Sequence, residues 1–245
     1  MKNSDRSRKG FTLIELLTVI AIIGVLAAVL FPGVQGVMRS AKKNSALNKL
    51  RSIGQGYMNW AQGGKVMTRV GTWTATGNVA TKVSEYAANL AAGAALDSGE
   101  LWFVDGDVML ERNTIANLPK NVIRTQGTNT VVDPLFTAAL TAGTGTSWTV
   151  YSGTSSGVVG SVAVPLAWSR GLNNAGSWPA ADGTATGSCW GPEGGQIVYG
   201  DGHVSWCTDT LVTGQNYFTD TTGAPTANWQ MSRGVPATAQ ALQQQ

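Results

Sequence analysis

The chain has 245 residues and a mass of 25.5 kDa, enough for one well-cored domain and an anchor but too little for two large domains. Only 13% of the residues are charged and Gly, Ala, Thr and Ser are abundant, which argues against a coiled coil and favours a turn-rich β structure. The first ten residues account for the whole formal charge of +3, through Lys2, Asp5, Arg6, Arg8 and Lys9. The rest is formally neutral and lacks the basic stripe that phosphate neutralisation requires, so no nucleic-acid partner is expected.

Residues 11–31, FTLIELLTVIAIIGVLAAVLF, predict a transmembrane helix. At ~1.5 Å per residue they span a hydrocarbon core of ~30 Å. The basic leader, residues 1–10, is expected to stay in the cytoplasm by the positive-inside rule, so the remainder is exported. Because the apolar run is long and lacks a small-x-small cleavage site, it indicates a signal anchor rather than a secretory signal peptide.

Glu15 is the one carboxylate in this run. A charge within a membrane span is costly and needs a partner, and nothing in the same helix is expected to supply one. The alternative is that Glu15, at the cytoplasmic end of the helix, extends toward the interface.

The segment Lys9-Gly10-Phe11-Thr12-Leu13-Ile14-Glu15-Leu16 resembles the prepilin peptidase recognition segment of type IV pilins and type II secretion pseudopilins. The resemblance implies cleavage between Gly10 and Phe11 and methylation of the new N-terminus. It also implies that Glu15 pairs with the cationic N-terminus of a neighbouring subunit and sets the axial register of a filament. The implied partners are prepilin peptidase, other copies of the chain and related pilins, an inner-membrane assembly platform and the lipid bilayer.

Residues 32–62 are expected to continue the same helix. Pro32, followed by Gly33 and Gly36, predicts a kink or a locally melted turn. Beyond it an apolar stripe at helical spacing predicts the face that docks on the head; it comprises Leu47, Leu50, Ile53, Tyr57 and Ala61. Basic residues on other faces fit either a solvated surface or contacts to lipid head groups; they are Lys42, Lys43, Lys49 and Arg51. The spine helix is thus predicted from Phe11 to Ala61.

Residues 63–222 are assigned to one head domain and residues 223–245 to a flexible tail. Residues 83–96 predict a second helix, and residues 130–140 fit a helix or a strand. Residues 162–168, 196–199 and 203–206 predict strands, the last two joined as a hairpin by Asp201-Gly202. The expected fold is α+β, with a long N-terminal spine helix packed on a C-terminal head that contains an antiparallel β-sheet.

Residues 165–172 and 194–204 resemble the C-terminal region of a large pilin-like family that has an Asp-Gly strand turn. That family often has a histidine ten residues before its Asp-Gly, where this chain has Gly191.

The two cysteines, Cys189 and Cys207, bracket the predicted hairpin on the exported side. Such a pair in an oxidising compartment predicts a disulfide that closes the base of the hairpin. The alternative is two buried free thiols.

The sequence predicts no catalytic residues, no metal site and no cofactor. His203 is the single histidine, and no nucleophile-elbow spacing accompanies it, although a tethered hydrolase using Asp201 and His203 is an alternative. A structural calcium ion is left open because carboxylates cluster at two places without a regular calcium-loop spacing. These carboxylates are Asp105, Asp107 and Glu111, and Asp201 with Asp209.

The functional prediction is a structural subunit of a pilus-like filament, a pseudopilin of a type II secretion system, and not an enzyme. It would be a single-pass inner-membrane protein that moves into a periplasmic or extracellular filament. The alternative is a minor tip or adhesin-like pilin whose tryptophans bind a ligand such as carbohydrate, although core packing explains the same residues. They are Trp148, Trp168, Trp178, Trp190, Trp206 and Trp229.

Overall fold

A computed structural model gives the architecture of the chain. It describes residues 11–62, 65, 67, 73–74, 77–112, 118–140, 146–152, 164–173, 176–184, 186–208, 218–219, 222, 224–226 and 240–241. The chain divides into two compact units, residues 1–43 and 44–245. The predicted leader, with Gly10, lies outside the described residues.

Helix α1 runs from Leu13 to Trp60, 48 residues, close to the predicted spine. It contains Pro32 and is helical throughout, so of the two forms predicted there the locally melted turn does not occur; the kink stays a prediction. In the first unit its large apolar side chains are exposed as far as Met38. Thus the N-terminal half of α1 buries no apolar surface within its own chain.

The C-terminal part of α1 belongs to the second unit and is amphipathic. Its buried apolar side chains follow the helical repeat: Ala46, Leu50, Ile53, Tyr57 and Trp60. The predicted stripe is confirmed except at its start, where Leu47 is half-buried and Ala46 takes the inward position. A small residue there lets the helix approach its neighbours closely.

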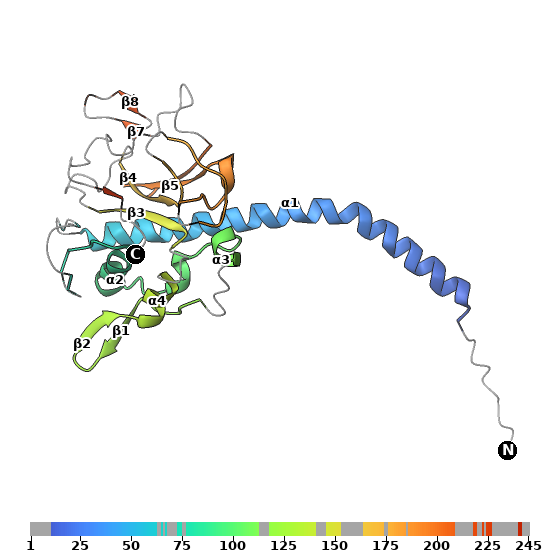
Figure 1. Cartoon of the computed structure of the whole chain (residues 1–245), viewed down its shortest axis with the longest axis horizontal. Helices are drawn as coiled ribbons and strands as arrows, with labels where there is room; N and C mark the ends of the chain where they lie inside the picture. The colour runs from blue at the N-terminus through green and yellow to red at the C-terminus, as the bar shows by residue number, and fades with distance from the viewer. Residues whose placement is uncertain are drawn as a thin grey trace, which may run out of the picture. The chain divides into compact units, whose positions relative to one another are not determined.

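The head contains an antiparallel sheet in the order β6-β5-β4-β3-β9. Figure 1 labels its strands β3, β4 and β5. Its strands are β3 (Trp148–Ser152), β4 (Pro165–Ser169), β5 (Gly195–Tyr199), β6 (Val204–Cys207) and β9 (Gln240–Ala241). The predicted hairpin is confirmed: Ile197 pairs with Ser205, and Gly202 in the turn has φ +87°, a conformation that favours glycine. The α+β prediction is therefore correct.

Most of the predicted flexible tail, residues 223–245, lies outside the described residues, so its flexibility stays a prediction. Within it β9 pairs with β3, and β8 (Pro225–Thr226) pairs with β7 (Phe218–Thr219). The Pro and Gln content of this stretch indicated disorder, but backbone pairing with a strand distant in sequence gives residues 240–241 a place in the sheet.

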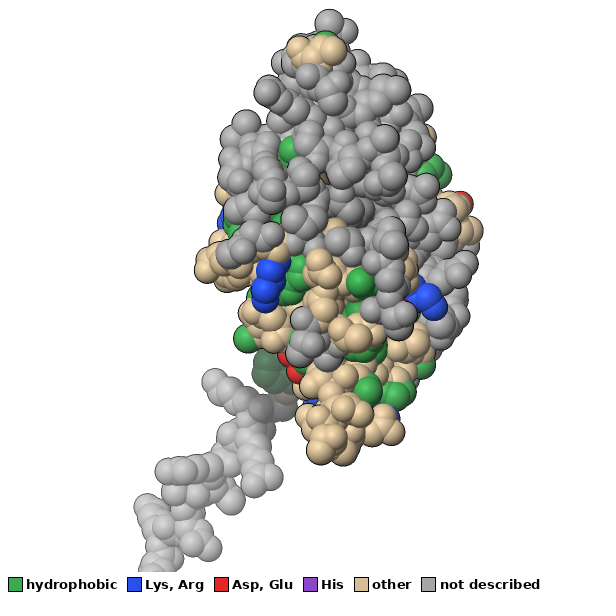
Figure 2. All heavy atoms as spheres, turned by 90° about the vertical axis from the view of Figure 1, so that its left-hand side faces the viewer, with side chains coloured by type: hydrophobic (Ala, Val, Ile, Leu, Met, Phe, Trp, Pro, Cys, Tyr) green, Lys and Arg blue, Asp and Glu red, His purple; other side chains and the backbone are tan. Residues whose placement is uncertain are grey.

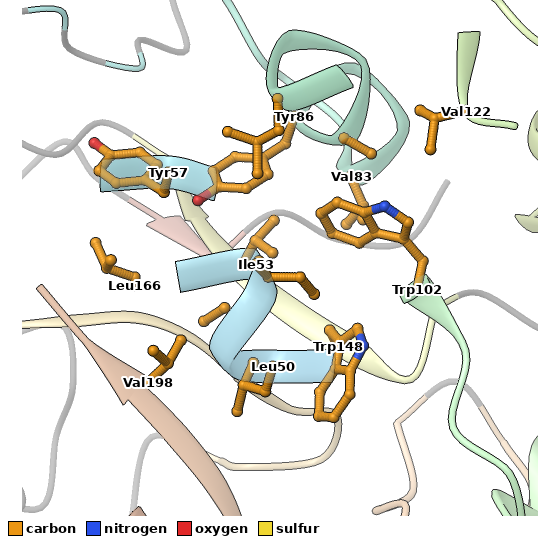
Figure 3. Packing of buried hydrophobic residues seen from close by; sticks show 14 of the residues in the cluster. Leu50, Ile53, Tyr57, Val83, Tyr86, Trp102, Val122, Trp148, Leu166 and Val198 are labelled. Atoms are coloured by element: carbon orange, nitrogen blue, oxygen red, sulfur yellow. The ribbon is translucent and has the colours of Figure 1, made fainter. Parts of the chain in front are cut away.

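The sheet is covered on both faces by apolar side chains. Val198 of β5 packs in a cluster with Leu50, Ile53 and Tyr57 of α1 (Figure 3). Its neighbours Ile197 and Tyr199 pack in a second cluster. Successive side chains of a strand point to opposite faces, so these clusters lie on the two sides of the sheet. This explains why β4 and β5 are buried at every residue.

Helix α2 (Val83–Ala94) covers the face of α1 that turns away from the sheet. Tyr86 stacks on Tyr57 with ring centroids 6.0 Å apart, and Trp102 meets Tyr86 edge-on. The C-terminal part of α1 is therefore enclosed between α2 and β5, as the labelled side chains of Figure 3 show. The helix ends at Ala94, two residues before the predicted Leu96, because the next residue, Ala95, has a φ of 56° and caps it.

The segment that fitted either helix or strand contains both. Strand β2 (Asn129–Val132) pairs with β1 (Ile123–Gln126), and α4 (Pro134–Ala139) follows. Asp133 separates them, because its side chain accepts a hydrogen bond from Leu135 N at 2.7 Å and caps α4. The short helices η1 (Gly99–Trp102), α3 (Val108–Arg112) and η4 (Gly191–Glu193) complete the described elements.

Gly54 allows α1 to lie directly on the sheet, and this contact can be tested. A Cβ added there would lie 2.4 Å from Val198 Cγ2, and Val198 is fully buried. Gly54→Ala gains helix propensity of about 1 kcal/mol but overpacks the core at a cost of about 1–3 kcal/mol. We expect a lower midpoint of chemical denaturation, followed by tryptophan fluorescence of the full chain in detergent.

Two further variants complete this test. Gly36→Ala is the matched control in the same helix, because a Cβ there meets nothing within 4 Å; it should leave the midpoint unchanged or raise it. In a protein that already carries Val198→Ala, Gly54→Ala should cause little further loss of stability, because the side chain that it would clash with is shortened. A Gly54→Ala protein as stable as the Gly36→Ala protein would contradict the packing described here.

Candidate functional site

The start of α1 is built around Glu15 and Thr12. The Thr12 backbone N–H and hydroxyl donate to Glu15 Oε2 at 2.9 and 2.8 Å, and Glu15 N–H donates to Thr12 Oγ1 at 3.3 Å. This reciprocal arrangement is a capping box, which satisfies two backbone donors at a helix N-terminus. Thr12, the residue before α1, thus supplies hydrogen bonds to Glu15 but no positive charge, and the expectation that the helix itself provides no partner for this charge stays a prediction.

The geometry leaves one Glu15 oxygen outside the capping box, since all the described bonds to its side chain use Oε2. The Thr12 hydroxyl is the only side-chain donor described for this carboxylate. The neighbouring side chains, Phe11 and Leu13, are more than four-fifths exposed. The carboxylate is thus fixed in direction at the end of an exposed apolar helix.

Helix α1 is long and apolar enough to cross a membrane, and none of its most apolar stretch is buried in the structure. Water-exposed apolar area on this scale marks a membrane or protein interface. Glu15 is the one charged side chain in the stretch from Phe11 to Phe31.

A second polar centre lies inside the head, around Asp107. Arg170 Nη2 contacts Asp107 Oδ1 at 2.6 Å, and the two side chains are 3% and 0% exposed. Met109 N–H donates to the same oxygen, and the Ser147 hydroxyl and Cys189 thiol donate to Oδ2 at 2.8 and 3.3 Å. Asp107 is thus a buried carboxylate whose two oxygens are both occupied by protein donors.

Arg170 extends the same network to the loop before η4. Its Nη1 donates to the carbonyls of Thr184 and Gly187, and its backbone N–H donates to Ser147 O at 2.9 Å. One ion pair therefore joins α3, the start of β3, the end of β4 and the loop before η4. Its arrangement is structural, because both charges are enclosed.

The predicted disulfide between Cys189 and Cys207 is not present: both residues are free, buried thiols. Cys189 packs in the cluster that contains α1, and Cys207 packs in the cluster on the opposite face of the sheet. Strand alternation causes this, because Val204 and Trp206 of β6 face α1 and Cys207 faces away. Burial and, next, the charge of Asp107 raise the pKa of the Cys189 thiol well above its usual value, so it remains a donor.

Free thiols predict a defined alkylation result. Exported full-length protein, unfolded in denaturant and alkylated, should gain two alkyl groups whether or not it is first reduced. Intact mass measures this, and Cys189→Ser, which keeps a donor for Asp107, should gain one group under both conditions. If the cysteines were alkylated only after reduction, the result would show that Cys189 and Cys207 are joined in a disulfide.

The carboxylates for which a structural calcium ion was left open are only partly described, so that alternative stays untested. Asp107 is engaged by Arg170, and within the described residues no group of three His, Cys, Asp or Glu side chains is placed to hold a metal ion. The Glu111 side chain and Asp209 lie outside the described residues. The fold uses Asp107 as an ion-pair partner because Arg170, distant in sequence, reaches it in the core.

His203 and Asp201 are in contact at the turn of the β5–β6 hairpin. His203 Nδ1 lies 2.5 Å from Asp201 Oδ1, and the His203 ring stacks on Tyr199 with centroids 4.4 Å apart. Partial burial opposes ionisation of Asp201, but hydrogen bonds from the His203 backbone and ring outweigh it and lower the pKa of that carboxyl. The pair orders the turn, a role that needs no substrate.

The tryptophans support the packing interpretation where they are described. Trp148 and Trp168 are almost completely buried, Trp178 and Trp190 are 5% exposed, and Trp206 is half-buried. Trp229 lies outside the described residues. A ligand platform of exposed rings therefore has little basis in this sheet.

Two of these features were missed in the sequence. The capping box had a local signal, since Thr12 precedes Glu15 by three residues at the start of an apolar run. The Asp107–Arg170 pair had none, because its partners are 63 positions apart.

The N-terminal segment is similar in sequence to segments of known proteins. Residues 5–31 match the family described as the prokaryotic N-terminal methylation motif. Fimbrial protein EcpC of Eikenella corrodens is 51% identical over 41 residues, 17% of this chain and 27% of that protein. Type II secretion system core protein G of Escherichia coli K12 is 42% identical over 53 residues, 22% of this chain and 36% of that protein. No solved structure matches.

The chain therefore has the N-terminal segment of prepilin-type proteins, and the resemblance inferred from residues 9–16 is confirmed. The match spans only about a third of the length of these relatives, or less. The terms pilin, pseudopilin and N-terminal methylation motif therefore describe this segment only. They do not establish what the whole protein does.

Proposed function

We propose that the chain is a structural, non-enzymatic subunit of a type IV pilus-like filament, of the pseudopilin kind found in type II secretion systems. Prepilin peptidase removes residues 1–10, and the mature chain starts at a methylated Phe11. An inner-membrane assembly platform then transfers it into a filament of copies of the chain and related pilins.

The observation that carries this proposal is an exposed apolar helix with one oriented carboxylate. A helix whose first half buries nothing in its own chain needs a bilayer or other helices around it. It finds the bilayer before assembly and its neighbours' helices afterwards. The similarity of this segment to fimbrial and secretion core proteins supports the same two environments.

Glu15 gives the assembly its register. The N-terminus of mature Phe11 is cationic, and in an apolar filament interior a carboxylate of a neighbouring subunit is its natural partner. Thr12 holds Glu15 Oε2, so the other oxygen is the one available to accept from an incoming amine. The subunit waits as a single-pass inner-membrane protein with its head exported, and the filament is periplasmic or extracellular.

The first test is the N-terminus of the mature protein. Membrane or filament material should contain a chain that begins at methylated Phe11, because Gly10 and Phe11 stand at the cleavage position of the motif. Intact mass and N-terminal peptide mass spectrometry measure it. A strain without prepilin peptidase is the control and should retain residues 1–10. Assembled material that keeps the leader would overturn the proposal.

A further inference from the structure

The two free thiols of the head are buried on opposite faces of the sheet. The Cys189 sulfur lies 3.3 Å from Asp107 Oδ2 and 3.1 Å from the Ser147 carbonyl oxygen, and the residue is 3% exposed. Cys207 is fully buried in the cluster that contains Trp168. On the face drawn in Figure 2, the described hydrophobic side chains show only as small, separate patches, which fits a core that encloses them. The folded head therefore screens both thiols from an oxidant in solution.

The backbone of the sheet holds the two cysteines apart. Cys207 ends β6 and pairs with Gly195 of β5. The Cys189 backbone N–H donates to the carbonyl of Arg170, just beyond β4, at 3.3 Å. A disulfide requires the two Cβ atoms to come within about 4.5 Å of each other, with their side chains directed toward one another. Because Cys189 and Cys207 face opposite sides of the sheet, a disulfide between them and the native sheet exclude each other.

The unfolded chain has no such barrier. The two cysteines are 18 positions apart, and closing a flexible loop of this length carries a small entropy cost. Their thiols are then exposed to solvent, where thiol–disulfide exchange can reach them. A disulfide formed at this stage would stabilise the unfolded chain against the folded one.

We propose that the head is a redox-sensitive switch: a disulfide between Cys189 and Cys207 prevents the sheet from forming, and the folded sheet prevents the disulfide. This inference rests on the proposed export of the head into a compartment that oxidises thiols. One cysteine thiolate attacks a disulfide oxidant to form a mixed disulfide, and the other then displaces the remaining half of the oxidant. The cysteines lose two electrons and two protons, and the oxidant leaves as two thiols. The order of folding and oxidation thus decides whether an exported subunit is competent to assemble.

The test refolds the full chain in detergent from two starting states. The chain is unfolded in denaturant, treated with oxidised glutathione or with dithiothreitol, and diluted after the reagent is removed. Mass spectrometry identifies the chain with the internal disulfide by the loss of its thiol hydrogens. We expect this chain to recover at least about tenfold less native tryptophan fluorescence than the reduced chain, because the cross-link and the sheet exclude each other. Dithiothreitol added afterwards should restore the signal.

The variant Cys189→Ser/Cys207→Ala is the control, since it cannot form the disulfide and its serine keeps a donor for Asp107. It should refold equally after both treatments. A second measurement needs no variant: folded native protein in oxidised glutathione should keep both thiols alkylatable, and denaturant should speed their oxidation.

Two results would overturn the switch. One is a chain with the internal disulfide that reaches the denaturation midpoint of the reduced chain. The other is folded protein that forms the disulfide without losing its native fluorescence. Both are independent of the N-terminal analysis at Phe11, which tests the proposed function separately.

Discussion

Glu15→Ala is expected to reduce filament assembly strongly while the protein still accumulates in the membrane with a folded head. Removing a carboxylate makes the apolar run more hydrophobic, so insertion is retained. Assembly should fall by at least about tenfold, because the N-terminal amine of a neighbouring subunit is then buried without its counter-charge. Filament yield, compared with membrane-fraction abundance of the same variant, measures the effect.

Glu15→Gln separates the two roles of this side chain. Glutamine can serve in a capping box, so the contacts with Thr12 are kept while the charge is lost. A yield between those of Glu15→Ala and the native protein is expected. Native yield for Glu15→Gln would reduce Glu15 to a helix cap, and native yield for both variants would remove it from assembly altogether.

Asp107→Asn should be the most damaging polar substitution in the head. Arg170 is then left as a buried guanidinium without its carboxylate, and breaking a buried pair costs about 3–5 kcal/mol. That is a large share of the ~5–15 kcal/mol that stabilises a typical domain. Because the chain has nine tryptophans and several are buried, denaturation of the full chain in detergent can be followed by their fluorescence.

Asp105→Asn is the control for this substitution, because it removes the same charge two residues away. The Asp105 side chain is 63% exposed and 3.9 Å from Lys49, so its loss should change stability by no more than about 1 kcal/mol. Arg170→Met should be about as harmful as Asp107→Asn, and the two together should cost less than their sum. Equal denaturation midpoints for Asp107→Asn and Asp105→Asn would show that the buried network does not support the head.

The parts of the protein that depend on neighbouring residues were predictable. The helix period and apolar content of residues 11–61 gave α1 to within about two residues at each end, since side chains three and four apart share a face. The turn at Asp201-Gly202 predicted the β5–β6 hairpin because φ at Gly202 favours glycine. The motif of residues 9–16 identified the N-terminal segment, and Thr12 with Glu15 carried the signal for the capping box.

Tertiary structure decided what depends on residues far apart in sequence. Cys189 and Cys207 bracket the hairpin in the sequence. Strand alternation nevertheless places Cys207 on the opposite face of the sheet, where it cannot meet Cys189. Nothing near Asp107 in the sequence indicated its partner, and only the fold places Arg170 beside it. Local periodicity and turn chemistry are set within a few residues, whereas the partner of a buried cysteine or carboxylate is chosen by the packing of the whole core.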